Sequence, residues 1–474
     1  MTGSIAASPS AAWSNLFRDG RGLYTALVIL GVLLHALQIL VIAIIMPSVV
    51  ADIGGAAYYT WAAMIYTVGS IAGAASLGPV WSGLGRRAGY AAAGVVFLAG
   101  TVGCAIAPDM ATLIVARAIQ GFGGGLIAGG CMALISSLFD GGLRPRILAL
   151  YQGVWTVSQL CGPVVGGALA ELGWWRGSFW VMAPIVLAFI AFAWTKLPEQ
   201  PAAERRRHAS AAVFPVVRLA MLSAGILAIA AAGPVRGLAL RVVLLAGGIG
   251  LLWLAFRLDR RAPNRLYPAR AWSLGAPVGI ALWITFLVGI VQTSISVFMP
   301  LHLQVVHGVS PVFISFVTIV MSLGWTIGTF SVSGWAGARE RTALLIGPPL
   351  MVLGTVGIAA SAELHMLTVL TASALMLGVG MGTHNVHLIA RTMANADKGE
   401  ERITASAMPS IRSLGTGCGA ALAGMLSTMA GLGNATEPAA VADAVTTVYA
   451  FQIIPALLTI WLMLRLVRIG VPKA

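Results

Sequence analysis

Charged residues are scarce in this chain. Asp, Glu, Lys and Arg make up 9% of its 474 residues, against roughly 25% in soluble domains, which excludes a soluble globular protein. The 15 acidic residues are outnumbered by 29 Lys and Arg, giving a net charge of +14. Because the basic residues fall in short gaps between apolar runs, this excess predicts orientation in a membrane and no nucleic-acid partner.

Cysteine is also scarce, and no reacting set of side chains is present. The four cysteines, Cys104, Cys131, Cys161 and Cys418, lie in apolar segments without metal-ligand spacing, which predicts packed thiols and not disulfides. The Gly-rich run at 121–125 lies within an apolar helix and follows no strand, so it does not predict a dinucleotide site. The sequence therefore predicts no enzyme, no cofactor and no metal centre.

Apolar residues are what the chain has in abundance: 58% are hydrophobic, and the mean hydropathy is +0.91. At about 20 residues per crossing, the pattern predicts an all-α integral membrane protein with fourteen transmembrane helices. The predicted spans are 23–46, 59–81, 90–107, 110–139, 147–169, 177–194, 216–232, 238–256, 275–303, 311–332, 343–360, 366–389, 406–430 and 447–466. The predicted organisation is a tail (1–22), a six-helix bundle (23–195), a linker with two inserted helices (196–271), a second six-helix bundle (272–468) and a tail (469–474).

Positive charge alternates between successive gaps. Arg176, Arg236 and Arg241 fall on one side of the predicted membrane, Arg117 and Arg412 fall within helices, and every other Lys and Arg falls on the side of the N-terminus. The positive-inside rule then places both termini in the cytoplasm, with the chain as a multi-pass protein of a bacterial-type inner membrane.

The chain resembles itself at an offset of about 253 residues. Segment 81–87 (WSGLGRR) corresponds to 335–341 (WAGARER), and 159–162 (QLCG) corresponds to 412–415 (RSLG). Two six-helix pseudo-repeats joined by an inserted helix pair are the simplest interpretation. Repeated halves place a substrate cavity at their interface near the bilayer midplane.

These segments resemble the major facilitator superfamily, and the helix count resembles its fourteen-spanner drug–proton antiporter branch. After its second helix the family has G-x-L-A-D-R-x-G-R-K; residues 78–87 read GPVWSGLGRR, so Gly78, Gly85, Arg86 and Arg87 match and Ser82 replaces the family's Asp. Segment 117–121, RAIQG, is similar to the family's R-x-x-Q-G and includes Arg117 and Gln120. The resemblance implies alternating access between two halves, with the loop after the second helix biasing it.

The fifth predicted helix carries the strongest match, because 162–167 (GPVVGG) is similar to the branch's G-P-x-x-G-G. Pro163 removes a backbone donor, and Gly162, Gly166 and Gly167 permit close helix crossing. In the family this motif accompanies export in exchange for protons. The alternative is ordinary small-residue packing.

The first predicted helix departs from the family, since Gln38 stands where the branch has an acid. All 15 acidic residues fall in loops, tails or helix ends, so no mid-membrane carboxylate is available for coupling. Histidine could substitute: His35 is central in the first helix, with Gln38 on the same face, and His384 and His387 are three residues apart in the twelfth. Two imidazoles could hold a metal, but without a carboxylate or thiolate partner a neutral, hydrogen-bonded histidine is favoured.

Other polar residues of predicted spans are candidates to line the cavity. An intramembrane charge usually faces a cavity or a partner, so Arg117 and Arg412 predict an electropositive cavity, unless carbonyl groups or helix-end acids neutralise them. The remaining candidates are Trp155, Gln159, Gln292, Ser296 and Trp325.

The sequence therefore favours a secondary active exporter of small hydrophobic or amphipathic compounds, multidrug-efflux-like and proton-coupled. Its expected partners are a small-molecule substrate, the lipid bilayer and protons, and the chain is expected to act as a monomer. The alternative left open is a uniporter or importer of a specific metabolite, or a lipid carrier, without proton coupling.

Overall fold

A computed structural model describes residues 13–18, 20–139, 143–199, 215–235, 237–263, 265–364, 366–432 and 437–469. These parts of the chain form helices and connections and no strand. The helices are α1 (Arg21–Ile53), α2 (Trp61–Ala105), α3 (Met110–Leu138), α4 (Arg144–Glu171), α5 (Gly177–Trp180), α6 (Met182–Lys196), α8 (Val216–Ala231), α9 (Leu238–Arg261), α10 (Pro277–Leu301), α11 (Pro311–Val332), α12 (Ala338–Leu364), α13 (Leu367–Ala394), α14 (Glu401–Met429) and α15 (Pro438–Ile469), with short turns η1 (Trp13–Leu16), η2 (Ala56–Tyr58) and η3 (His302–Val306). The predicted all-α membrane class is confirmed.

Each predicted span overlaps a helix, with two differences in where helices begin and end. Spans 59–81 and 90–107 share one helical run, α2, and span 177–194 is interrupted at Val181 between α5 and α6. Among the described residues, ten helical segments are long and apolar enough to cross a membrane, and one of them, Ala56–Ala105, holds two predicted spans. The count of fourteen stays a prediction.

Gly85 explains how α2 holds two spans. Its backbone has φ 81° and ψ 166°, so the run reverses direction there. Residues with a Cβ avoid positive φ, so a glycine is suited to this sharp turn. The predicted spans had left all of residues 82–89 as the connecting loop.

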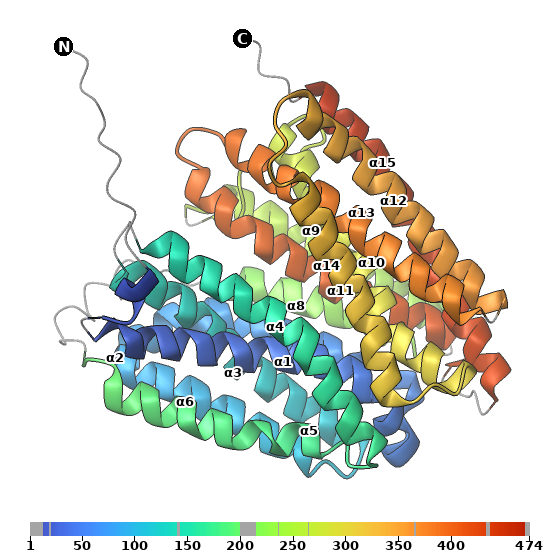
Figure 1. Ribbon diagram of the computed structural model, residues 1–474, viewed down its shortest axis with the longest axis horizontal. Helices are drawn as coiled ribbons and strands as arrows, with labels where there is room; N and C mark the ends of the chain where they lie inside the picture. The colour runs from blue at the N-terminus through green and yellow to red at the C-terminus, as the bar shows by residue number, and fades with distance from the viewer. Residues whose placement is uncertain are drawn as a thin grey trace.

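The helices form two sets that contact each other through few elements (Figure 1). Helices α1–α6 pack together, α10–α15 pack together, and the sets meet where α4 contacts α11, α2 contacts α14 and α1 contacts α10. Inserted helix α8 packs on α2 and α14, and α9 packs mainly on α8. We call the first set the N half, the second the C half, and the end of the molecule where α1 begins and α15 ends the proximal end; the opposite end is the distal end. The domain boundaries at 22, 195 and 271 stay predictions.

Glycines let helices within each half approach closely. A Cβ on Gly121 or Gly125 of α3 would lie 2.3 or 1.9 Å from a carbonyl oxygen of α2, and one on Gly378 or Gly382 of α13 would lie 2.1 Å from a carbonyl oxygen of α11. Since no side chain fits there, the backbones themselves are in contact, as is common where membrane helices cross.

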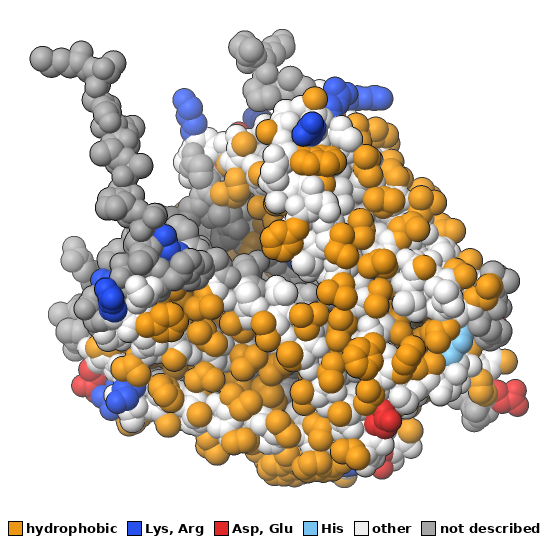
Figure 2. Space-filling model, viewed as in Figure 1, with side chains coloured by type: hydrophobic (Ala, Val, Ile, Leu, Met, Phe, Trp, Pro, Cys, Tyr) orange, Lys and Arg blue, Asp and Glu red, His pale blue; other side chains and the backbone are white. Residues whose placement is uncertain are grey.

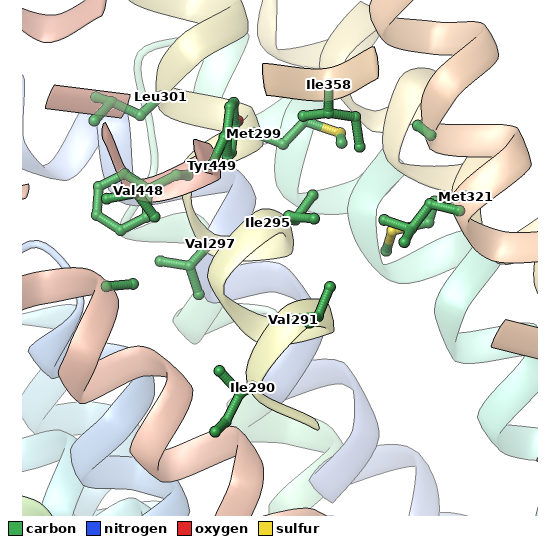
Figure 3. Close-up of a cluster of buried hydrophobic side chains, with 14 of the residues drawn as sticks. Ile290, Val291, Ile295, Val297, Met299, Leu301, Met321, Ile358, Val448 and Tyr449 are labelled. Atoms are coloured by element: carbon green, nitrogen blue, oxygen red, sulfur yellow. The ribbon is translucent and has the colours of Figure 1, made fainter. Parts of the chain in front are cut away.

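The largest core cluster follows α10 along the junction of the halves. Figure 3 shows Ile290, Val291, Ile295 and Val297 of α10 among side chains of neighbouring helices, including Tyr449 of α15. The surface is also apolar, because hydrophobic side chains cover much of the face in Figure 2. In α9 only 11% of the most apolar window is buried, so this helix presents its hydrophobic residues to the surroundings, as a lipid-facing helix does.

Candidate functional site

Arg117 of α3 lies fully buried in the N half, and all its contacts are uncharged. Its Nε donates to the carbonyl oxygen of Ala62 at 3.0 Å, Nη1 donates to Oε1 of Gln120 at 2.6 Å and of Gln38 at 3.3 Å, and Nη2 donates to the Gln38 carbonyl at 3.3 Å. The guanidinium also lies over the ring of Tyr66, 4.3 Å from its centroid. The sequence left two possibilities for Arg117: it faces the cavity, or protein groups neutralise it. The contacts agree with the second, because carbonyl and amide oxygens hold the guanidinium.

Gln120 and Gln38 orient this guanidinium. Gln120 Nε2 donates to Oγ1 of Thr101 at 2.9 Å, which fixes its oxygen toward Arg117. Gln38 Nε2 is buried without a partner. Gln38 therefore contacts Arg117, and no hydrogen bond joins it to His35 among the described residues, although both side chains were expected on one helix face.

His35 of α1 pairs with a tyrosine that the sequence did not single out. Its Nδ1 lies 3.0 Å from the hydroxyl of Tyr66, and its ring lies edge-on to Trp155 of α4, with centroids 6.1 Å apart. Tyr66 thus contacts both Arg117 and His35. A tyrosine in the middle of the membrane needs a hydrogen-bond partner for its hydroxyl. This requirement could have identified Tyr66 from the sequence as a residue that contacts other polar groups.

Arg412 of α14 is the corresponding cation of the C half, and it is only partly buried. It donates to Oε1 of Gln292 in α10 and lies 4.8 Å over the ring of Trp325 in α11. No carboxylate forms an ion pair with it among the described residues. Its guanidinium has five N–H donors, so most of them remain available.

The two histidines of α13 face different backbone carbonyls. The Nδ1–H of His384 donates to Gly380 O at 2.8 Å, and the Nε2–H of His387 donates to Val332 O at 2.9 Å. Nε2 of His384 is buried and has no partner, which leaves it as an acceptor. Among the described residues no three His, Cys, Asp or Glu side chains group as metal ligands.

Of the remaining polar candidates, Gln159 of α4 and Ser296 of α10 are half-buried. Among the described residues, neither side chain is hydrogen-bonded to Arg117 or Arg412. Cys161 is exposed, so its prediction as a packed thiol is wrong; the other three cysteines are buried and free.

The motif after the second predicted helix lies at the proximal end. Ser82 Oγ donates to Pro79 O at 2.9 Å, and Arg87 lies 3.7 Å from Glu199 and over the Trp194 ring. Both partners of Arg87 belong to the N half and its C-terminal extension. Gly78 and Arg86 share this segment with Gly85, the turn residue described above.

The GPVVGG segment of α4 faces α1 on one side and α11 on the other. A Cβ on Gly162 or Gly166 would meet side chains of Leu37 or Val41 in α1 at 3.1 or 3.0 Å. A Cβ on Gly167 would lie 2.5 Å from the carbonyl oxygen of Pro311 at the start of α11. The motif therefore lies on the contact between the halves.

Further contacts join the halves at the distal end. Ser315 Oγ donates to the Pro163 carbonyl at 2.6 Å, and the backbone N–H of Val312 donates to Glu171 Oε2 at 3.1 Å. On the α2–α14 side, Thr428 Oγ1 donates to the carbonyl oxygen of Ala57 at 3.4 Å. The distal end is thus closed.

At the proximal end the two helix sets diverge (Figure 1). Among the described residues, the hydrogen bonds between the N and C halves lie near the distal end. Among the described residues, the two halves are therefore joined near the distal end and diverge toward the proximal end.

Comparison with known proteins gives one family. The family described as the Major Facilitator Superfamily matches residues 28–420. A probable multidrug-efflux transporter of Mycobacterium tuberculosis is 30% identical over 430 residues, which cover 89% of this chain and 90% of the relative. The multidrug transporter protein MdtP of Bacillus subtilis is 27% identical over 179 residues, 37% of this chain and 33% of that protein.

Solved structures share the fold at low sequence identity. A peptide transporter structure aligns with a TM-score of 0.66 and 16% identity over 98% of both chains. A D-xylose–proton symporter aligns with a TM-score of 0.62 and 15% identity, covering 91% of this chain and 97% of the other. These likenesses support the arrangement of helices and say nothing about the substrate.

Proposed function

Because the chain belongs to the Major Facilitator Superfamily and is a secondary membrane transporter, we propose that it exports small hydrophobic or amphipathic compounds by alternating access. The observation that carries the proposal is the contact between α4 and α11. The GPVVGG segment, typical of the antiporter branch, packs there with Gly167 directly against the backbone of Pro311. The named function of the relatives, multidrug efflux, supports the same direction of transport.

We propose that substrate binds between the halves, on the side of Arg412. This cation is half-buried, retains free donors and has Trp325 and Gln292 beside it. An aromatic face with a positive charge suits an amphipathic compound, and especially an anionic one. The closed distal end and the proximal opening correspond to a state that takes up substrate from the cytoplasm.

Both termini are proposed to lie in the cytoplasm of a bacterial inner membrane, with the chain acting as a monomer. Cysteine labelling at Gly237, between α8 and α9, tests this topology because that residue has open space around it. We expect labelling by an impermeant reagent from outside the cell. Labelling only from inside would contradict the fourteen-helix arrangement.

We propose that protons drive this export and that His35 carries them. Imidazole can change its charge near neutral pH. If His35 alternates between a water-exposed and an occluded state of the transporter, its desolvation in the occluded state favours the neutral ring and releases the proton. His384, with its unpaired Nε2, is the second candidate.

The decisive experiment measures flux in proteoliposomes with and without a pH gradient. We expect His35→Gln to abolish gradient-driven flux and to leave substrate binding and passive exchange largely intact. Tyr66→Phe is the matched control, since it removes the hydrogen bond to His35 and keeps the imidazole. Normal gradient-driven transport in both His35→Gln and His384→Gln would exclude histidine coupling and favour the uniporter, importer or lipid-carrier alternative.

A further inference from the structure

A cavity lies in the connection between α9 and α10, outside the contacts that join the two halves. This cavity of about 430 Å³ opens at the proximal end, between the last turn of α9 and the segment that leads into α10. Its lining residues are Arg260, Ala269, Arg270, Trp272, Ser273, Gly275 and Ala276. We propose that this cavity binds the phosphate of an anionic phospholipid headgroup.

Among the described residues, acidic side chains neutralise little of the positive charge of this cavity. Arg260 is exposed and makes no ion pair with any described residue. Its neighbour Asp259 is already bound, because it accepts hydrogen bonds from Arg218 and from the backbone N–H groups of Leu266 and Tyr267. An anion in the cavity would therefore meet an uncompensated guanidinium.

Arg270 adds a second guanidinium that is weakly held. Its Nε lies 4.0 Å from Asp397 Oδ2, and the two side chains are 66% and 53% exposed, so this pair contributes little. Arg265, close in sequence, is by contrast 2.8 Å from Glu400 with both side chains mostly buried. The connection thus keeps one arginine paired and leaves two available to a phosphate, which guanidinium groups bind through paired hydrogen bonds.

Uncharged donors complete the site. The indole N–H of Trp272 is buried and has no acceptor among the described residues, although buried indole donors usually find one. Helix α10 begins at Pro277, directly after the lining residue Ala276, so the positive end of its dipole adjoins the cavity.

An aromatic cluster and a lipid-facing helix border the cavity and favour a lipid over a free anion. The Trp272 ring lies 4.3 Å from that of Phe256 and 4.8 Å from that of Trp283. Along α9, Trp253 is 58% exposed and Ile249 is 61% exposed. A lipid could place its acyl chains along this apolar surface and its phosphate at the arginines, as basic pockets on the cytoplasmic side of membrane proteins do.

The test titrates purified full-length protein in detergent with phosphatidylglycerol and follows bound lipid by native mass spectrometry. We expect phosphatidylglycerol to bind at least about tenfold more tightly than phosphatidylcholine, and the double variant Arg260→Gln/Arg270→Gln to lose that preference. Trp272→Phe, which keeps the ring and removes the donor, should weaken binding a few-fold.

The matched control is Arg339→Gln/Arg341→Gln, which removes the same charge from exposed residues at the proximal end of α12. It should bind phosphatidylglycerol like the unmodified protein. Equal binding of the two lipids, or equal loss in both double variants, would overturn the proposal. Displacement of the lipid by millimolar inorganic phosphate would overturn the lipid assignment in favour of a free-phosphate site.

Discussion

The two intramembrane arginines lie in very different surroundings, although each contacts a glutamine from the first helix of its half. Arg117 is fully buried and meets four oxygen acceptors and the Tyr66 ring. Arg412 is half-buried and has Gln292 and the Trp325 ring. The positions of Gln38 and Gln292 in the sequence are separated by nearly the repeat offset. Corresponding glutamines of the two halves therefore contact a sealed arginine in one half and a partly open arginine in the other.

The difference teaches how to assign roles to charges of the same kind. A guanidinium whose donors are satisfied inside the protein stabilises helix packing, because its removal leaves buried acceptors unpaired. One with free donors at a partly open surface can bind substrate at little structural cost. We infer that Arg117 supports the N half and that Arg412 contacts the substrate.

Replacing Arg117 should have the largest effect. Arg117→Met keeps much of the side-chain volume but leaves the side-chain oxygen of Gln38 without its donor and that of Gln120 with only the weak Cys104 S–H. We therefore expect a loss of about 3 kcal/mol of unfolding free energy. Thermal or denaturant unfolding in detergent measures it. A stable but transport-inactive Arg117→Met protein would break the comparison, since Arg117 would then act on substrate.

Gly167→Ala tests whether the two halves must touch as closely as they do. The new Cβ would lie 2.5 Å from the Pro311 carbonyl, so we expect the distal-closed state to lose about 2 kcal/mol. Spin labels at Ile106 and Met366, exposed at the distal ends of the N and C halves, should report longer distances.

Gly166→Ala is the matched control for this variant. Its Cβ would meet movable side chains of Val41 and Ile45 at 3.0 and 3.6 Å, so its label distances should stay near those of the unmodified protein. Identical distances in both variants would show that the α4–α11 contact does not govern closure.

Arg412→Gln should separate transport from stability. We expect transport of an anionic amphiphile in proteoliposomes to fall by about tenfold, which corresponds to about 1.4 kcal/mol, while the unfolding midpoint stays close to that of the unmodified protein. Trp325→Phe, which keeps an aromatic ring, should have the smaller effect. A large loss of stability in Arg412→Gln would make the two arginines alike and remove the distinction.

Glu171→Gln should have the smallest effect. The Glu171 carboxylate of the N half accepts a hydrogen bond from Val312 at the N-terminus of α11 in the C half, where a negative charge contributes about 0.5 kcal/mol. A slight shift toward longer Ile106–Met366 label distances is expected. Glu437→Gln, an exposed distal acid, should leave them unchanged; equal shifts in both would mean that only general charge matters.

Much of the fold follows from local sequence. The apolar runs predicted the long helices, because hydropathy and helix breakers are read over some 20 neighbouring residues. The repeat at about 253 residues predicted two sets of helices. The family was also readable, since 117–121 and 162–167 carry short motifs, and the family match confirms it. The sequence analysis did not predict that the turn is made at Gly85 alone, because hydropathy carries no information about φ.

The candidate site was only partly readable. Arg117 and Arg412 were found because they are charged residues inside apolar spans, and Gln120 was found because it lies in the segment that resembles the family's R-x-x-Q-G. Tyr66, which contacts both Arg117 and His35, was overlooked because its ring counts as apolar in a hydropathy scan.

The sequence by itself determined that the chain spans a membrane and belongs to this family of transporters. Composition and periodicity are sums over neighbouring residues and need no tertiary contact. Only the tertiary structure decided that Arg117 is sealed while Arg412 stays partly open, and that Gly167 faces the other half. Those facts depend on which helices pass within hydrogen-bond or van der Waals distance, and residues as far apart in the chain as Gln38 and Arg117, or Gly167 and Pro311, meet only when the helices pack.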